Sequence, residues 1–294
     1  MLAYLTIIGY CLTVASSAIL IQDAHIDKSI AIIMGASCGI LFYGLLNIKN
    51  LGSLMTKIRK NWISVVAINV ATASGWLFGY LYGLEYIDAA TLFCIEMAVI
   101  PIVSFVVSTP FREYSQRIPT LIAILCSVIS MGLIIRQNVL SGGHVNSYII
   151  GTCIALMAGI GTAYVGIFSK KLGENHFTST QILMTRLLFV LLLGLLISIQ
   201  RNAFTGLTFA DIKPALLSGC MAGILTCFLY QKSLDLLGFM VVSTLVPFTP
   251  VFAYFIRVYR GNQPFSSFLF VIILICSLTI CGMNILMYQR TKNK

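Results

Sequence analysis

Two stretches of the sequence contain the same features in the same order, and they determine the predicted fold. Residues 79–115 read GYLYGLEYIDAATLFCIEMAVIPIVSFVVSTPFREYS, and residues 227–266 read CFLYQKSLDLLGFMVVSTLVPFTPVFAYFIRVYRGNQPFS. Each contains Leu-Tyr, a short polar turn, an apolar segment with proline, and a basic break. A weak internal repeat of this kind is typical of membrane proteins built from two related halves.

The composition indicates a chain that crosses a membrane many times. Of its 294 residues, 59% are hydrophobic and 10% are charged, whereas soluble domains have about 25% charged residues. Mean hydropathy is +0.96. A backbone inside a bilayer has to satisfy its own hydrogen bonds, so the apolar segments are predicted to be helices. The ten predicted segments are about 2–21, 29–48, 61–83, 87–108, 118–136, 147–168, 179–199, 212–233, 238–258 and 266–288. The first segment lacks a basic region and a cleavage site of the signal-peptide type, so we expect it to be a retained span.

Five segments in each half would make the two halves enter the membrane from opposite sides. The predicted fold class is therefore an all-α integral membrane protein with ten transmembrane helices in two inverted five-helix repeats, residues 1–140 and 141–294. Twelve of the 19 Lys and Arg residues would lie on the side of both termini, and six on the other side. The positive-inside rule then predicts that both termini are cytoplasmic and that the protein is a multi-pass protein of the cell membrane. It also accounts for the net charge of +10 without a nucleic-acid partner.

Several positions connect the sequence to a known family. Pro101 and Glu113 are twelve residues apart, as are Pro250 and Asn262, and Arg186 lies early in the seventh segment. Together with the chain length, the repeat and the number of spans, these features resemble the EamA-type members of the drug/metabolite transporter superfamily over nearly the whole chain. Asn262 replaces the glutamate of that pattern, so we assign no function to that position or to Glu113.

The resemblance has consequences for fold and function. It implies a carrier that moves small organic solutes by alternating access, in a bacterial inner membrane. It implies a central cavity between spans 3, 4, 8 and 9, with spans 1, 2, 6 and 7 around it. Spans 5 and 10 would lie at the periphery, where a homodimer contact could form.

Two charged residues interrupt the apolar segments. Because a charge at this depth costs a few kcal/mol, we expect Glu96 to face a cavity and bind a cationic group of the substrate or a proton, which would couple transport to proton movement. The alternative is a neutral acid hydrogen-bonded to a neighbouring helix. Arg186 could reach the headgroups with its long stem or enter the cavity and bind a carboxylate. Glu96 and Arg186 together would suit a zwitterion such as an amino acid.

Further candidates share helix faces with one another. The third segment repeats polar and aromatic residues at helical spacing, the eighth has two polar residues on one face, and a proline in the ninth would free a backbone carbonyl. These candidates are Asn69, Trp76, Tyr80, Thr226, Tyr230 and Pro250. Interfacial anchoring is the alternative for the aromatic rings. We expect the line Gly151, Ala155, Gly159 and Thr162 to pack against another helix.

The predicted function is secondary transport of a small organic metabolite, an amino acid or a related compound, in the export direction. Uptake of an amine or of a nucleoside-type nutrient is the alternative. The sequence has no catalytic, nucleotide-binding or dinucleotide-binding motif, and its nine cysteines form no CxxC pair. We therefore predict no enzyme activity, no catalytic residues, no cofactor and no metal. A membrane enzyme or a scaffold protein is the other class that the sequence leaves open.

Overall fold

The computed structural model describes residues 2–24, 26–108 and 145–292, together with Leu125, Val128, Ile129, Gly132, Leu133 and Arg136. Nearly all of the described chain is helical, as the predicted fold class requires. The first part contains α1 (Leu2–Gln22), α2 (Lys28–Leu46), η1 (Ile48–Asn50), α3 (Leu51–Lys60), α4 (Trp62–Thr72), η2 (Ala73–Gly83), α5 (Leu84–Tyr86) and α6 (Ala89–Ser108). The second part contains α8 (Val145–Glu174), α9 (Ser179–Arg186), α10 (Leu188–Gln200), α11 (Phe209–Cys220), η3 (Met221–Thr226), α12 (Cys227–Leu245), η4 (Val246–Phe248), α13 (Thr249–Tyr259) and α14 (Ser267–Lys292).

Six helical stretches of the described chain are long and apolar enough to cross a membrane. They are Ala3–Gln22, Lys28–Leu46, Trp62–Tyr86, Val145–Glu174, Ser179–Gln200 and Phe209–Gly238. Ala89–Ile100 and Ser267–Gly282 form shorter apolar helices. The predicted fifth segment falls on residues that are mostly outside the described part, and so does Glu113. The membrane class of the chain is thus confirmed, and the number of ten spans stays a prediction.

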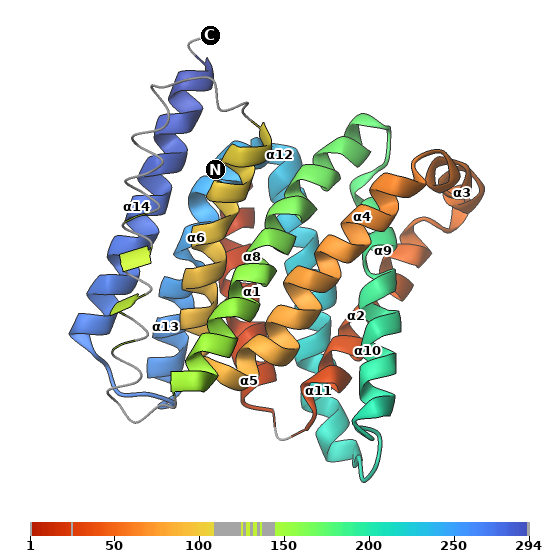
Figure 1. Ribbon diagram of the computed structural model, residues 1–294. Coiled ribbons are helices and arrows are strands. Elements are labelled where there is room, and N and C mark those ends of the chain that lie inside the picture. The colour runs from red at the N-terminus through yellow and green to blue at the C-terminus, as the bar shows by residue number, and fades with distance from the viewer. Residues whose placement is uncertain are drawn as a thin grey trace.

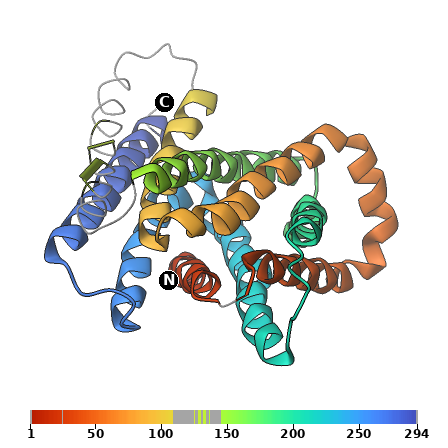
Figure 2. The same ribbon diagram turned by 60° about the horizontal axis from the view of Figure 1, so that its bottom comes forward.

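The long helices form a bundle in which most successive members run in opposite directions, whereas α6 and α8 run in the same direction, and α1 begins on the side where α14 ends (Figure 1). Helices from the two predicted halves alternate within this bundle. α6 packs along α8, α1 packs against α12 and α13, and α2 packs against α10 and α11. Viewed from another direction, η1 and α3 form the rim of the bundle between α2 and α4 (Figure 2).

Glycines allow these helices to approach each other at the backbone. A Cβ atom added to Gly223 would lie 2.0 Å from the carbonyl oxygen of Gly35. A Cβ atom added to Gly161 would lie 2.6 Å from the amide nitrogen of Gly75. In lipid the hydrophobic effect does not drive helices together, so close van der Waals packing through small residues stabilises such crossings.

The basic stretch 49–61, which the sequence suggested was a connection, forms η1 and the helix α3 instead. Leu54 on α3 is buried in a small apolar cluster with Val65 and Ile182. Lys57 Nζ donates hydrogen bonds to the carbonyl oxygen of His176 at 2.6 Å and to Gln181 Oε1 at 3.2 Å. A ten-residue amphipathic helix is too short to be found by hydropathy alone.

The predicted eighth and ninth segments also differ in detail. Helical structure continues from α12 past the predicted end at residue 233, and the backbone breaks at Gly238, where φ is 74° and ψ is 160°. This left-handed conformation favours glycine, because a Cβ would clash with the backbone. Pro247 and Pro250 stand at the starts of η4 and α13. At such positions a proline removes no hydrogen bond that the helix would otherwise form.

Candidate substrate-binding site

A cavity lies inside the bundle, where α1, α4, η2, α6, α8, α9, η3 and α12 meet. Its empty space amounts to about 620 Å³, including open space at its mouth. Six of the eight residues predicted from the sequence line this cavity: Trp76, Tyr80, Glu96, Arg186, Thr226 and Tyr230. Asn69 and Pro250 are not among the lining residues. Spans 3, 4 and 8 contribute described lining residues, as expected. Spans 1, 6 and 7 also contribute such residues, whereas span 9 contributes none of them.

Glu96 reaches the cavity from α6. Asp88 caps the start of this helix by accepting hydrogen bonds from the backbone amides of Ala90 at 3.0 Å and Thr91 at 3.2 Å, which fixes where the helix begins. The side chain of Glu96 lies two turns further on and is 6% exposed. Thr162 Oγ1 on α8 donates a hydrogen bond of 2.6 Å to Glu96 Oε1. Among the described residues, Glu96 forms no ion pair.

Small residues hold Glu96 and Thr162 at this distance. A Cβ atom on Gly159 would lie 2.7 Å from the carbonyl oxygen of Glu96, and one on Gly75 would lie 2.8 Å from Thr162 Oγ1. The line Gly151 to Thr162 therefore packs α8 against its neighbours, as the sequence indicated. Thr162 also has a polar role that its place in this line of small residues did not predict. Thr162 is the one residue with a hydroxyl group in that line of small residues, and this difference is the feature of the sequence that indicates its polar role.

Arg186 is the last residue of α9 and is 4% exposed. Its Nε and Nη1 atoms have no hydrogen-bond partner within the described part of the chain. The helix breaks immediately afterwards at Leu187, and α10 starts at Leu188. The long apolar stem of Arg186 does not bring the guanidinium group to the protein surface. The side chain therefore does not reach the lipid headgroups.

Asn69 stabilises the break that follows Arg186. Its Oδ1 accepts a hydrogen bond of 3.1 Å from the backbone amide of Phe189, and its Nδ2 donates one of 2.8 Å to the carbonyl oxygen of Val65. An amide group freed by a helix break inside a membrane needs a partner of this kind. Asn69 thus acts on the position of Arg186 from another helix, and its own side-chain bonds are directed at backbone atoms.

The two helices that provide most of the lining depart from α-helical geometry at the cavity. Trp76 and Tyr80 belong to the π-helical segment η2, and Ala222 and Thr226 belong to the π-helical segment η3. Wider turns of this kind occur often at functional sites, because the extra residue redirects side chains. Tyr43 Oη donates a hydrogen bond of 2.6 Å to the carbonyl oxygen of Ile224 in η3. This bond connects α2 to the irregular turn.

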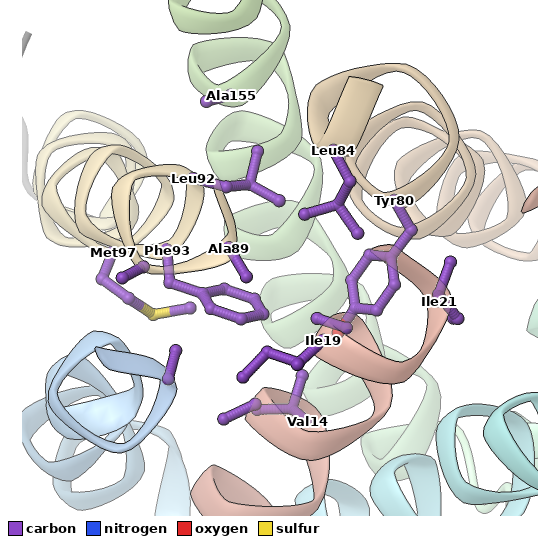
Figure 3. Close-up of a cluster of buried hydrophobic side chains, with 14 of the residues drawn as sticks. Val14, Ile19, Ile21, Tyr80, Leu84, Ala89, Leu92, Phe93, Met97 and Ala155 are labelled. Carbon is purple, nitrogen blue, oxygen red and sulfur yellow. The ribbon is translucent and has the colours of Figure 1, made fainter. Parts of the chain in front are cut away.

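Aromatic rings form much of the cavity wall. The ring centroids of Tyr10 and Tyr230 are 5.0 Å apart, and those of Tyr80 and Phe93 are 6.2 Å apart with an edge-to-face orientation. Figure 3 shows the side chains of Tyr80 and Phe93 extending toward each other over α1, which contributes Val14. Tyr10 and Phe93 were not predicted as lining residues, since single aromatic residues in apolar segments do not indicate which face meets a cavity. Among the described residues, no group of three or more His, Cys, Asp and Glu side chains is placed to hold a metal ion.

Helices of membrane-spanning length around a cavity with one buried acid and one buried base are the features of a multi-pass membrane carrier. Residues 149–285 match the EamA-like transporter family. This match supports the resemblance of the chain to the EamA-type membrane transporters of the drug/metabolite transporter superfamily.

A solved crystal structure has a similar fold, with a TM-score of 0.58 and 15% sequence identity over 96% of this chain and 93% of the other. At this identity the likeness concerns the fold alone. No curated protein shows significant sequence similarity to the chain.

Proposed function

We propose that the protein is a secondary transporter that exports a small zwitterionic metabolite, an amino acid or a related compound, by alternating access. The observation that supports this most directly is that Glu96 and Arg186 line the same cavity and form no ion pair with each other. A ligand with a cationic and an anionic group would compensate both charges. Aromatic walls suit the apolar part of such a solute and can add cation–π contact.

Two inverted five-helix repeats, residues 1–140 and 141–294, are part of this proposal. Reciprocal packing supports them. α6, in the place of the fourth span, packs on α8, in the place of the sixth. α13, in the place of the ninth span, packs on α1. An exchange of equivalent neighbours between halves is what pseudo-twofold symmetry within the membrane plane would produce.

Ion pairs join the two halves at one end of the bundle, where α1 ends and α6 begins. Arg201 Nη1 lies 2.8 Å from Glu85 Oε1 and 3.4 Å from Asp27 Oδ2, and the other two pairs are Arg257–Asp88 at 3.7 Å and Arg260–Asp23 at 3.0 Å. Among the described residues, every ion pair between the halves lies at this end, whereas hydrogen bonds such as Thr180 to Asn47 join them at the opposite end. This asymmetry supports a cycle in which one end closes while the other opens.

The distribution of charge supports cytoplasmic termini. On the side where α1 begins, basic residues gather with few acids to neutralise them: Lys49, Lys57, Arg59, Lys60, Lys170, Lys171 and Lys232. On the opposite side the arginines are paired with acids, as described above. An excess of cations on one side indicates the cytoplasmic side of a membrane protein.

Reconstitution into liposomes tests the proposed function. The wild type should move labelled amino acids down their gradient, and Glu96→Gln should abolish this flux or its dependence on pH, since an amide cannot exchange a proton. Glu174→Gln is the matched control, because Glu174 is an exposed acid outside the cavity. Flux that is unchanged by Glu96→Gln at every pH would reject the role of Glu96. Flux of simple amines but not of amino acids would favour the uptake alternative, and absence of all flux would favour a scaffold.

A further inference from the structure

Two buried side chains in the cavity offer hydrogen-bond donors that nothing in the described chain accepts. These donors are Nε and Nη1 of Arg186 and Oγ1 of Thr226. Both side chains line the cavity, Arg186 from the broken span α9–α10 and Thr226 from the π-helical segment η3. A buried guanidinium group that finds no acceptor among the described residues is strongly unfavourable, so we expect it to meet an anion during the working cycle.

The described part of the chain does not supply that anion. Glu96 is the one acid among the described lining residues, and its Oε1 atom already accepts the bond from Thr162. Asp235, another acid of the second half, accepts hydrogen bonds from Ser179 and from Gln231. Arg201, Arg257 and Arg260 each have a carboxylate partner, whereas Arg186, although buried, has none among the described residues.

We propose that Arg186 and Thr226 form a carboxylate subsite, in which the guanidinium group and the threonine hydroxyl donate hydrogen bonds to the substrate's carboxylate oxygens. This inference rests on the proposed function and assigns one end of the substrate within the same cavity. Arginine is suited to the task because its planar group stays charged and presents several N–H donors to a carboxylate.

A carboxylate fits the site better than a phosphate does. A phosphate ester has close to two negative charges at neutral pH, and Arg186 is the single cation among the described lining residues. Glu96 in the same cavity would add repulsion. A carboxylate has one charge, which Arg186 alone can balance, and the substrate's ammonium group is then free to approach Glu96.

The local backbone keeps the guanidinium group in place. The break at Leu187 ends α9 at Arg186, and Asn69 holds that break by accepting the amide hydrogen of Phe189. Thr185 Oγ1 bonds back to the carbonyl oxygen of Gln181 at 2.9 Å, a contact that tends to bend helices. Asn69 is therefore a positioning residue for the subsite, and the bond from Tyr43 to Ile224 has the same role for η3, which contains Thr226.

The test is a binding experiment on the purified full-length protein. Thermal-shift measurements with each standard amino acid first identify the ligand that stabilises the wild type most. Its Kd is then measured by calorimetry and compared with the Kd of two analogues, the amine that lacks the carboxylate and the carboxylic acid that lacks the amine.

Arg186→Gln should weaken binding of the amino acid and of the carboxylic acid by about 10- to 150-fold, the range for a lost hydrogen bond to a charged group. Arg186→Gln should change the Kd of the amine by less than a factor of about three, because the amine has no carboxylate to bond with Arg186. Thr226→Val should weaken the two carboxylate ligands by roughly 2- to 10-fold. Arg59→Gln, which changes an exposed arginine on α3, should leave all three ligands unaffected.

Several outcomes would overturn the subsite. These are the absence of any amino-acid shift in the wild type, equal losses for the amine and the carboxylic acid, or no loss with Arg186→Gln. If Arg186→Gln does not fold, Arg186→Lys keeps the charge without the planar donors and should still weaken only the carboxylate ligands. Because binding is measured without flux, a wild type that binds carboxylates but transports nothing would reject the transport proposal and keep the subsite.

Discussion

Replacing Thr162 with valine removes the one hydrogen bond that the Glu96 carboxylate accepts within the described part of the chain, while keeping the shape of the side chain. The bond is 2.6 Å long and lies between α8 and α6. Removing a partner from a buried acceptor costs about 1–3 kcal/mol. Since about 1 kcal/mol corresponds to about 2–4 °C in melting temperature for domains of 150–250 residues, Thr162→Val should lower the melting temperature by several degrees.

Thr152→Val is a control on the same helix. Thr152 Oγ1 is buried and has no hydrogen-bond partner within the described part of the chain. Removing an unpartnered buried hydroxyl relieves a desolvation cost, so this variant should be as stable as the wild type or slightly more stable. The same chemical change on α8 should thus have opposite effects at the two positions.

Unfolding can be followed with a maleimide dye, because most of the described cysteines are buried or half-buried free thiols that become reactive as the bundle opens. Thr162→Ser, which retains the hydroxyl, should recover most of the loss. The reasoning is refuted if Thr162→Val and Thr152→Val melt at the same temperature, because Glu96 would then gain nothing from its partner on α8.

Two further predictions concern the close packing at Gly223 and the ion pair between Arg201 and Asp27. Gly223→Ala should destabilise the protein by about 1–3 kcal/mol through overpacking, because its Cβ would meet the carbonyl oxygen of Gly35 at 2.0 Å. Gly173→Ala is the control and should be neutral or stabilising, because its Cβ would have nothing within 4 Å. Equal melting temperatures of the two variants would contradict the close crossing of α2 and η3. Partial burial raises the pKa of Asp27, but hydrogen bonds from Ser29 and the charge of Arg201 outweigh it and hold this pKa below its ordinary value. Stabilisation by Asp27 is therefore complete above its unfolded pKa of about 3.9 and is lost as the pH falls through the lower folded pKa. Arg201→Gln should accordingly lower the melting temperature at pH 7, and its difference from the wild type should shrink in acid. Arg59→Gln should show neither effect. A melting-temperature difference that is constant with pH would mean that the ion pair does not contribute.

The positions of the spans follow from hydropathy, and this part of the fold could be predicted. Length and apolar content locate α1 and α2 to within two residues, because the bilayer requires long apolar helices, whereas α8 continues six residues past its predicted end. The break at Leu187 could not be predicted in this way. No proline or glycine marks it, and the amide of Phe189 finds its partner on Asn69, more than a hundred residues away in sequence.

The candidate site was predictable where a charge contradicted its surroundings. Glu96 and Arg186 are ionisable residues in apolar segments, and both line the cavity. Asn69 was placed on the face of Trp76 and Tyr80 by assuming a regular period of 3.6 residues. The π-helical geometry of η2 begins at Ala73, between Asn69 and the two aromatic residues, and it changes the rotation per residue. The shared face therefore does not continue, and Asn69 bonds to the backbone of its neighbours.

The placement of charges bears on how the proposed cycle would be driven. At the end of the bundle where α1 ends and α6 begins, arginines already have carboxylate partners, so opening that end breaks ion pairs that are partly exposed and individually weak. In the cavity, Nε and Nη1 of Arg186 have no hydrogen-bond partner among the described residues, so an empty cavity that excludes water leaves a charge uncompensated. A carboxylate ligand removes that cost only while it is bound. Binding of the substrate would thus favour the state in which the cavity is sealed, and a ligand without a carboxylate would not provide the same stabilisation.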